Sequence, residues 1–320
     1  MSSLTNHVIA HHFGTRVTHL LKDRWPDYSV HEVDAARAWS LPTDTSVLLS
    51  GPSKVWADGP REQPSDWPKK LGWVQIPGAG ADQYPRWLLR NHVVTTGRGL
   101  NSGPIAEFAL ASMLAHAKRF PNAWISRQQD WRILQMDTLE GRTLGLLGFG
   151  SVAREVARRA LAFNMNIVVC RRSAAEPPPA GIGYAASLAA MLAEADHLVL
   201  AAPYTPETHH IINREALSGM KKGAHIVNVA RGGLIDQDAL LEALEGGRIG
   251  SASIDVTEPE PLPAGHPFYM HQRVRLSPHI AWNSPDTIDR LVAKFNQNLE
   301  RLLDGRTLLD VLDVTSVPVA

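Results

Sequence analysis

The sequence predicts an α/β protein with two doubly wound parallel-sheet domains, one inserted into the other. Short apolar runs alternate with helical patterns along most of the chain, and several of these runs are apolar at nearly every position. Strands buried on both faces of a parallel sheet have this character. A long helical pattern then follows the second series of strands. With 320 residues, 44% of them hydrophobic, the chain can fill two cores.

The composition excludes several classes of protein. Lys+Arg and Asp+Glu both number 32, with no long block of like charge, so neither a nucleic-acid surface nor a polybasic membrane anchor is predicted. The sequence has no run of 18 apolar residues and no secretory leader pattern. The single cysteine, Cys170, excludes an intrachain disulfide. We therefore expect a cytoplasmic protein whose partners are small molecules and a second copy of itself.

In residues 1–100 short apolar runs alternate with polar or helical stretches, as in a small α/β domain with a parallel sheet. The turn Gly78-Ala79-Gly80 follows one of its strands, and its backbone N–H groups can bind a carboxylate or another anion. A tight turn with nothing bound is the alternative. The strands expected in this domain are His7–Ala10, Tyr28–Val33, Ser46–Ser50, Leu71–Ile76 and His92–Thr95.

A helix is predicted to start at Asn101–Pro104, where polar capping residues precede a proline in the first turn. Its apolar spacing predicts that it continues to about Arg127. The chain then leaves this segment through Trp124 and Trp131. Exposed tryptophans on such a bridge between domains would suit a homodimer contact, whereas buried tryptophans would belong to a core.

From Thr143 predicted strands and helices alternate regularly. Strands are expected at Thr143–Leu147, Asn166–Cys170, His197–Ala201, His225–Asn228, Ser251–Asp255 and Val274–Leu276. Helices are expected between them at about Ser151–Ala162, Ser187–Ala195, Arg214–Met220 and Gln237–Glu245. Ser284–Asp286 caps a final helix, which we expect to return to the first domain. The predicted domains are residues 1–100 with 287–320, and residues 101–286.

Closely spaced glycines interrupt the pattern directly after the first strand of the second domain. Gly148 can make a tight turn, and Gly150 lets the backbone approach a pyrophosphate bound at the N-terminus of the following helix. Ala153 takes the third position of the pattern G-x-G-x-x-[GA], where a small side chain allows the helix to pack closely on the strand. The stretch predicts a Rossmann-type dinucleotide site.

The residues after the other strands of this domain support such a site. Ligands bind outside the carboxyl ends of the strands in open α/β sheets. Glycines, cations, a carboxylate and an imidazole all follow strands here, in the segments Gly148–Gly150, Arg171–Ser173, Ala202–Pro206, Val229–Gly233, Asp255 and Pro278-His279. This concentration of binding chemistry at one edge predicts a cofactor-dependent enzyme.

Several segments together resemble the signatures of the D-isomer-specific 2-hydroxyacid dehydrogenase family. These segments are Gly78–Asp82, Pro203–Thr208, Asn228–Asp236, Asp255–Pro263 and Ser277–Trp282. The likeness runs over most of the chain and, within the family, is closest to the glyoxylate/hydroxypyruvate reductases. The resemblance implies a Rossmann-type nucleotide domain inserted into a flavodoxin-like substrate domain.

The resemblance also implies the residues that contact the cofactor: Gly148, Phe149, Gly150, Ser151, Val152, Arg171, Arg172, Ser173, Ala202, Pro203, Thr208, Val229, Ala230, Arg231, Asp255 and His279. The family pattern expects an acidic residue after the second strand, where it binds the ribose 2′-hydroxyl of NAD. Arg171 stands there instead, followed by Arg172 and Ser173. Guanidinium groups bind phosphate oxygens bidentately, so we predict NADP(H) as the preferred cofactor, with NAD(H) as the alternative. Solvated surface arginines are the other interpretation.

The reaction implied is reduction of a small 2-oxoacid, of the glyoxylate or hydroxypyruvate type, to the D-2-hydroxyacid. His279 would protonate the carbonyl oxygen, and Glu260 would orient the imidazole and favour its protonated form. Arg231 would bind the substrate carboxylate and polarise the carbonyl. The predicted substrate contacts are Ala79, Gly80, Arg231 and His279. Specificity for the substrate side chain is expected from the loops around Trp56, Gln75, Ile76 and Arg98, and from Trp282.

Two other functions stay open. One is a dehydrogenase of another small anion, such as phosphite; formate is disfavoured, because formate dehydrogenases typically carry Gln where this chain has Glu260. The other is a dinucleotide-sensing scaffold that resembles the C-terminal binding protein co-repressors. No metal site is predicted, because the remaining histidines lack a complete ligand set at metal spacing. They include His11-His12, His209-His210, His266 and His271.

Overall fold

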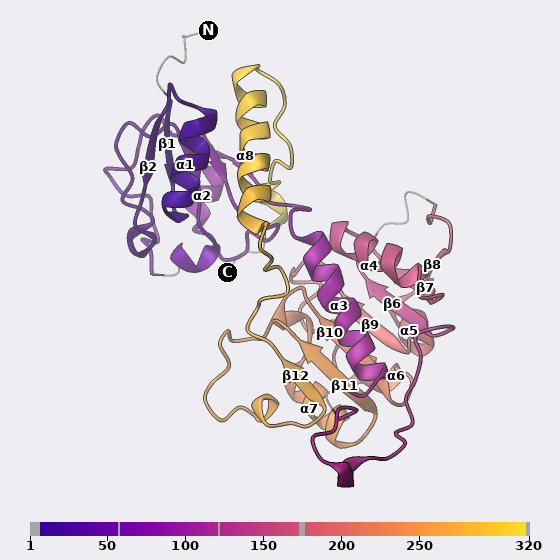
Figure 1. The fold of residues 1–320 in the computed structure, drawn as a ribbon. Helices are drawn as coiled ribbons and strands as arrows, with labels where there is room; N and C mark the ends of the chain where they lie inside the picture. The colour runs from indigo at the N-terminus through magenta and orange to yellow at the C-terminus, as the bar shows by residue number, and fades with distance from the viewer. Residues whose placement is uncertain (1–6, 57, 121, 173–176, 318–320) are drawn as a thin grey trace. The chain divides into compact units, whose positions relative to one another are not determined.

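The computed structural model describes residues 7–317 except 57, 121 and 173–176 (Figure 1). The chain divides into two compact units: unit 1 consists of Met1–Leu100 and Ser284–Ala320, and unit 2 of Asn101–Asn283. Each unit is built on one parallel sheet. The predicted α/β class with two parallel sheets is therefore confirmed.

Unit 1 contains a five-stranded sheet with the order β2-β1-β3-β4-β5. The strands are β1 (Val8–His11), β2 (Ser29–Glu32), β3 (Val47–Leu49), β4 (Trp73–Gln75) and β5 (Val93–Thr95). All neighbours pair in parallel, with Ile9 opposite both Val30 and Val47. The order 2-1-3-4-5 is that of flavodoxin-like folds, as the family resemblance implied.

Both faces of this sheet are covered. Because successive strand residues point to opposite faces, Val47 and Leu49 join one apolar cluster and Leu48 the other. Helices α1 (Gly14–Arg24) and α8 (Thr287–Leu303) contribute to the first cluster. α2 (Arg86–Arg90) contributes to the second. The 3-10 helices of this unit are η1 (Ala35–Arg37), η2 (Ser53–Trp56) and η6 (Val314–Ser316).

The last helix belongs to unit 1, although almost two hundred residues separate it from the preceding strand of that sheet. Phe295 of α8 stacks on Trp73 of β4, with ring centroids 5.0 Å apart. Asn298 is buried; its Nδ2 donates to Gln75 Oε1 at 3.2 Å, and its Oδ1 accepts from Leu309 N. These contacts tie the C-terminal segment to the first hundred residues.

Unit 2 contains a seven-stranded parallel sheet with the order β12-β11-β10-β9-β6-β7-β8. The strands are β6 (Thr143–Leu147), β7 (Asn166–Cys170), β8 (Ile182–Tyr184), β9 (His197–Leu200), β10 (Ala224–Asn228), β11 (Ile249–Ile254) and β12 (Val274–Leu276). In chain order within the unit this is 3-2-1-4-5-6-7, a Rossmann order extended by one strand. The direction of winding reverses between β6 and β9, which is where such sheets bind dinucleotides.

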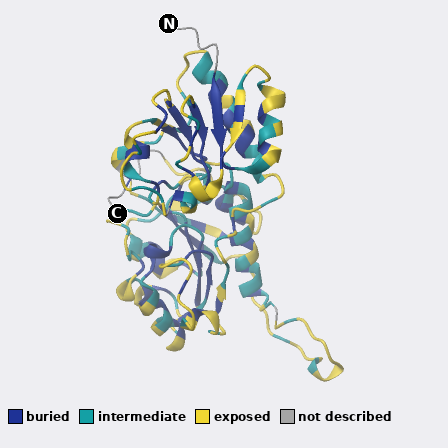
Figure 2. Cartoon of the chain, turned by 90° about the vertical axis from the view of Figure 1, so that its left-hand side faces the viewer, coloured by how far each residue is buried: buried dark blue, intermediate teal, exposed yellow. Residues whose placement is uncertain are grey.

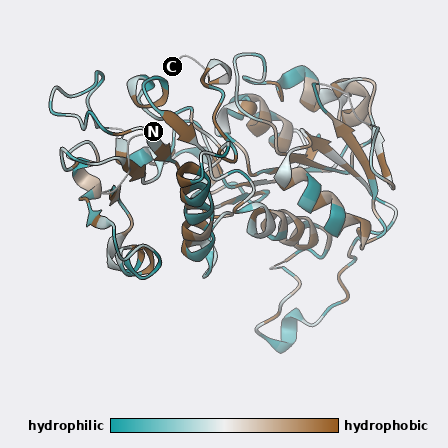
Figure 3. Cartoon of the chain, turned by 90° about the horizontal axis from the view of Figure 1, so that it is seen from above, coloured by the Kyte–Doolittle hydropathy of each residue, from teal (hydrophilic) through white to brown (hydrophobic). Residues whose placement is uncertain are grey.

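Two helical layers cover this sheet (Figure 3). Helices α3 (Ser102–Ala117) and α4 (Ser151–Leu161) pack on one face. The helices on the other face are α5 (Leu188–Glu194), α6 (Arg214–Gly219) and α7 (Gln237–Glu245). Shorter 3-10 helices lie at η3 (Gln128–Asp130), η4 (Gly232–Leu234) and η5 (Pro267–Tyr269). Among the described helices of either unit, none is long and apolar enough to cross a membrane.

The prediction that the bridging helix reaches about Arg127 is wrong. α3 ends at Ala117, because Arg119 takes a left-handed conformation with φ 55° and Phe120 N donates back to Ala115 O at 2.8 Å. The following segment extends as an exposed arm (Figure 2). Trp124 is 68% exposed on this arm and Trp131 is 82% exposed, so the interpretation of both as core residues is also wrong.

The sequence also missed the edge strand β8. Its three residues are too few to show the alternation of apolar and polar residues that identifies a strand, and none of them is fully buried. β8 pairs with β7 through the register Val169 to Tyr184. This strand matters for the site, because Tyr184 lies beside one of the predicted cofactor contacts.

Candidate active site

The glycine turn lies where the strand order of unit 2 reverses. Gly148 follows β6 with φ +90°, a conformation that residues other than glycine rarely adopt. A Cβ at this position would lie only 2.9 Å from the Cα of Ala202, which follows β9. The two loops therefore approach backbone to backbone, and the sequence needs glycine here for that approach.

The turn leads directly into an amphipathic helix. Gly150 is the N-cap of α4, and a Cβ there would meet open space. Ser151 and Val152 begin the helix, so their backbone N–H groups belong to its positively polarised end. Ala153 is fully buried against the sheet, as the third position of the fingerprint requires. Phe149 is buried beside this turn.

Arg171, which follows β7, is held by an aromatic neighbour. Its Nη1 donates to Tyr184 Oη at 3.2 Å, and its guanidinium carbon lies 5.5 Å from the centroid of that ring. Arg172 is exposed. Ser173, the third residue predicted to bind the 2′-phosphate, lies outside the described residues. The sequence indicates the contact between Arg171 and Tyr184 only by a tyrosine that follows the arginine loop, 13 residues after Arg171.

The loop after β9 is folded by a threonine hydroxyl. Thr208 Oγ1 accepts from Thr205 N at 2.7 Å and donates to Pro203 O at 2.9 Å. Thr208, Pro203 and the buried Ala202 are predicted cofactor contacts, and this folding holds them in one compact loop. Val229 and Ala230, two further predicted contacts, are half-buried directly after β10.

Arg231 follows them in a loop that Asn228 holds from the end of β10. Ala230 N donates to Asn228 Oδ1 at 3.1 Å, and Asn228 Nδ2 donates to Arg231 O at 2.9 Å. The next residue, Gly232, has no room for a side chain, since a Cβ would lie 2.1 Å from the carbonyl carbon of Thr257. The Arg231 loop is thus packed against the segment that leads to Glu260.

Glu260 and His279 form a hydrogen-bonded pair. Oε2 of Glu260 lies 2.9 Å from Nδ1 of His279, and both side chains are partly exposed. Burial acts to raise the pKa of Glu260, but the hydrogen bond from His279, the charge of that imidazole, Thr257 N–H and the charge of Arg231 together lower it. His279 and Arg231 therefore both lie close enough to Glu260 to favour its ionised form.

The turn that presents His279 is fixed by Asp255. The carboxylate of Asp255 is 2% exposed, and it accepts from Ser277 Oγ at 2.6 Å, from Ile280 N at 3.0 Å and from Ala281 N at 3.0 Å. His279 N donates to the backbone oxygen of Asp255 at 2.8 Å. These bonds hold His279 at φ 54°. Residues other than glycine rarely adopt this left-handed backbone conformation, and they keep it where surrounding contacts enforce it. Asp255 is a positioning residue for the imidazole; its predicted contact with the cofactor stays a prediction.

Unit 1 carries the other predicted substrate contacts. Ala79 is exposed and Gly80 half-buried in the loop after β4. Gly97 N donates to Gly78 O at 2.8 Å, and Gly97 lies so close to Pro77 that a Cβ would reach 1.9 Å from its carbonyl oxygen. The loop with the small residues is therefore fastened to the segment after β5.

The residues expected to select the substrate side chain are mostly internal. Trp56 is 2% exposed, and Gln75 and Ile76 are fully buried. The amide of Gln75 is hydrogen-bonded to Thr95 and Asn298 inside the core. These side chains pack inside the unit, and the loops around them stay the predicted source of substrate specificity. Arg98 is exposed, and Trp282 Nε1 donates to His279 O at 2.7 Å.

The fold and site of unit 2 define a Rossmann-type dinucleotide-binding domain with an imidazole–carboxylate pair. Consistent with this, the family model for "D-isomer specific 2-hydroxyacid dehydrogenase, NAD binding domain" matches residues 110–281. The chain belongs to the D-isomer specific 2-hydroxyacid dehydrogenase family, whose members are oxidoreductases acting on CH–OH donors. The resemblance found in the sequence motifs is confirmed.

Individual relatives agree with this assignment. The chain is 35% identical over 212 residues to glyoxylate/hydroxypyruvate reductase A of Serratia proteamaculans, covering 65% of this chain and 66% of the relative. It is 34% identical over 233 residues to a D-3-phosphoglycerate dehydrogenase of Methanocaldococcus jannaschii, covering 71% of this chain but 44% of that protein. The chain thus spans less than two thirds of either relative.

A solved structure matches over a longer range. A D-isomer specific 2-hydroxyacid dehydrogenase family protein from Aeromonas salmonicida superposes with a TM-score of 0.83 at 28% identity. The match covers 98% of this chain and 100% of that one. Both units therefore have counterparts in a member of the family.

Proposed function

We propose that this protein reduces a small 2-oxoacid, of the glyoxylate or hydroxypyruvate type, to the D-2-hydroxyacid. The observation that carries the proposal is the Glu260–His279 pair at 2.9 Å, presented beside Arg231 in a dinucleotide-binding domain. The name of the Serratia proteamaculans relative supports this substrate class. The name of the Methanocaldococcus jannaschii relative makes a phosphorylated hydroxyacid the first competitor to test.

The roles of the side chains follow from their contacts. Glu260 engages Nδ1 of His279, which leaves Nε2 as the ring nitrogen that can donate a proton to the carbonyl oxygen. An ionised Glu260 stabilises the imidazolium and fixes the ring orientation. Arg231 binds the substrate carboxylate with a charge that persists at any working pH. Backbone N–H groups of Ala79 and Gly80 are proposed as further carboxylate ligands.

The proposed cofactor is NADP(H), which supplies the hydride when bound. Gly148 and Gly150 leave room for a pyrophosphate at the start of α4, and the residue directly after β7 is Arg171 rather than an Asp or Glu that would repel a 2′-phosphate. The guanidinium of Arg171, already oriented by Tyr184, is suited to bind that phosphate together with Arg172. Unit 2 is accordingly proposed as the nucleotide domain and unit 1 as the substrate domain. We place the reaction in the cytoplasm, since a single cysteine fits a reducing compartment.

A homodimer is part of the proposal. The arm that follows α3 exposes Trp124, Ile125, Trp131, Ile133 and Met136. Large apolar side chains on a protruding segment are unfavourable in water and typical of interfaces. A second copy of the chain is the proposed occupant, because a two-fold contact would cover the arms of both protomers at once.

The test is an NADPH-oxidation assay of the purified full chain with glyoxylate, hydroxypyruvate, 3-phosphohydroxypyruvate, pyruvate and phenylpyruvate. We expect the highest kcat/KM with glyoxylate or hydroxypyruvate, and the D-isomer as the product where the product is chiral. If kcat/KM is highest with 3-phosphohydroxypyruvate, the proposed substrate class changes from glyoxylate or hydroxypyruvate to a phosphorylated 2-oxoacid. Absence of turnover on all five, with NADPH still bound, would favour the sensing scaffold, and NADP⁺ reduction by phosphite would favour the other dehydrogenase.

A further inference from the structure

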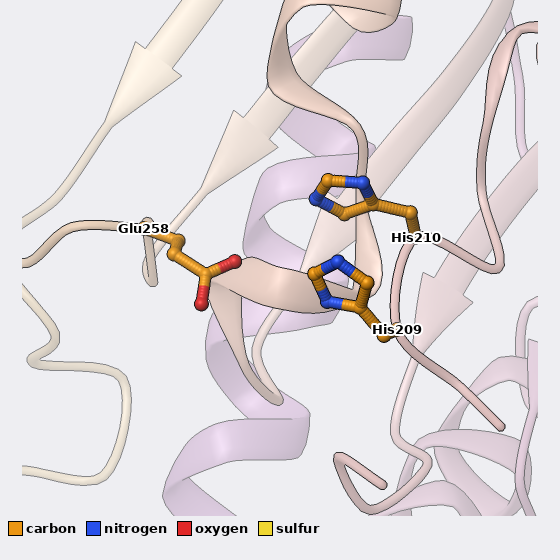
Figure 4. Close-up of side chains that lie close together, drawn as sticks. All are labelled: His209, His210 and Glu258. Carbon is orange, nitrogen blue, oxygen red and sulfur yellow. The ribbon is translucent and has the colours of Figure 1, made fainter. Parts of the chain in front are cut away.

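Two adjacent histidines and a glutamate converge on the surface of unit 2, and none of them belongs to the proposed active site. His209 and His210 lie in the loop between β9 and α6, and Glu258 follows β11. Each offers one ligand atom, and these atoms lie within 4.8 Å of one another. Figure 4 shows the two imidazoles one above the other, with the carboxylate of Glu258 on one side of both rings.

The backbone at His210 places both rings on the same side of the chain. In extended backbone, neighbouring side chains point to opposite sides. His210 instead has φ 49°, a left-handed conformation, and the rings of His209 and His210 stack with centroids 3.8 Å apart and planes 21° apart. Backbone bonding fixes this arrangement, since His210 N donates to Gly233 O at 2.8 Å.

A tyrosine orients the first imidazole. Tyr204 Oη lies 3.0 Å from Nδ1 of His209. Histidines that bind metal ions commonly donate their other ring N–H to an oxygen, which fixes the tautomer and directs the free nitrogen at the ion. With Nδ1 of His209 engaged by the hydroxyl, Nε2 is the nitrogen left for coordination.

The position of the carboxylate depends on a glycine. A Cβ on Gly233 would lie 2.6 Å from the ring of Tyr204 and 2.7 Å from Oε2 of Glu258, so the absence of a side chain lets both groups approach. The backbone of Glu258 is held as well, because Glu258 N donates to Gln237 Oε1 at 3.1 Å. The glutamate is thus fixed opposite the histidines by contacts independent of any ion.

We propose that His209, His210 and Glu258 form a binding site for a divalent transition-metal ion of the zinc class. Two neutral imidazoles and one carboxylate are ligands that Zn²⁺ accepts, with water completing a tetrahedron. Mg²⁺ and Ca²⁺ prefer sets made of oxygen and are disfavoured by two nitrogens. No metal site was predicted because the remaining histidines lack a complete ligand set at metal spacing along the sequence; for His209-His210 the fold brings a third ligand group close from a distant strand end.

The site would act on the enzyme through its loop. Glu258 lies two residues before Glu260, so a bound ion would tie the segment that carries Glu260 to the loop that carries Thr208. We therefore expect the ion to raise the thermal stability of the protein.

The experiment is calorimetric titration of Zn²⁺ into the full chain, freed of tags and of metal. The wild type is expected to bind one equivalent saturably. His209→Ala, His210→Asn and Glu258→Gln should each weaken Kd at least tenfold; Asn tolerates the left-handed backbone at 210, and Gln keeps the shape of the glutamate. His31→Asn, at an exposed histidine of unit 1, is the matched control and should bind like the wild type.

A rescue variant separates lost ligands from lost folding. Glu258→His supplies a third imidazole and should retain Zn²⁺ binding within about tenfold of the wild type, whereas Glu258→Gln does not. Co²⁺ titration should give visible absorption bands in the wild type that Glu258→Gln loses. Absence of saturable binding by the wild type, or an unchanged Kd in the three ligand variants, would overturn the proposal. NADPH affinity, measured in parallel, reports on the proposed function separately.

Discussion

Nδ1 of His279 lies 2.9 Å from Oε2 of Glu260, and the two residues reach each other from separate loops of unit 2. Asp255 holds the turn of His279 from inside the protein, while the Arg231 loop packs against the segment that carries Glu260. The pair therefore depends on three strand ends rather than on local sequence. This dependence makes its chemistry testable by single substitutions that leave the turn intact.

His279→Ala is expected to lower kcat by 10²- to 10⁴-fold, because the proton donor is removed while the cofactor loops remain. Glu260→Gln should lower kcat less, because the amide keeps the shape of the glutamate but removes the carboxylate charge beside the imidazole. Steady-state rates, with NADPH binding measured by fluorescence, check both. An unaltered kcat in His279→Ala would contradict the assigned role.

The two glycines of the turn should respond differently to the same substitution. Gly148→Ala puts a Cβ 2.9 Å from the Ala202 backbone at positive φ, so we expect a loss of at least about 2 kcal/mol in the free energy of unfolding. Gly150→Ala meets open space, so the fold should persist while NADPH affinity falls. Denaturant unfolding and cofactor titration separate the two. Equal stability of both variants would refute the steric argument.

Cofactor choice is expected to depend on Arg171. Arg171→Ala should reduce kcat/KM for NADPH by about 10- to 100-fold, the value of one or two charge-assisted hydrogen bonds, and leave NADH nearly unaffected. Tyr184→Phe, which removes only the hydroxyl that orients the guanidinium, should have a smaller effect in the same direction. The measurement is the ratio of kcat/KM values for the two cofactors. A wild-type preference for NADH would contradict the prediction.

The arm after α3 should decide the oligomeric state. Trp131 and Ile133 are 82% and 100% exposed, and replacing both by Glu places charge in the proposed contact. Sedimentation analysis should give a dimer for the wild type and a single chain for the double variant, with NADPH affinity retained. A monomeric wild type would remove the dimer from the proposal.

Stability is expected to fall as the pH is lowered below neutrality. Burial lowers the pKa of His12 to about 4, more than its hydrogen bond to Ala38 raises it. Its Nδ1 accepts from Gly51 N at 2.9 Å, so a proton there would face another N–H. The unfolded chain takes up the proton near pH 6.5 and the native protein does not. The free energy of unfolding should therefore decrease from about pH 6.5 toward pH 4, by on the order of 3 kcal/mol for this histidine.

Denaturant unfolding at several pH values checks this slope. His12→Gln cannot bind the proton and should show a shallower dependence on pH. His31→Gln, at an exposed position, should keep the slope of the wild type. A steeper slope in His12→Gln would contradict the assignment.

The sequence alone determined most of the helices and strands and the candidate residues that follow them. The strands Thr143–Leu147 and Asn166–Cys170 were predicted to the residue, because apolar runs bounded by turn residues are local signals. The family motifs identified Arg231, Glu260 and His279 as candidates. Local signals failed where a contact outside the element decided the outcome. α3 stops ten residues early because Arg119 turns left-handed and Phe120 N donates back to Ala115 O.

Only the tertiary structure decided which distant groups meet. Asp255 clamps the turn of His279, Tyr184 of an unpredicted edge strand orients Arg171, and Glu258 lies opposite His209 and His210. The physical reason is that strand order brings loops together whatever their separation along the chain. Hydrophobic periodicity and turn residues report on structure within a few residues of the chain. These contacts instead require the order 3-2-1-4-5-6-7 of the whole sheet.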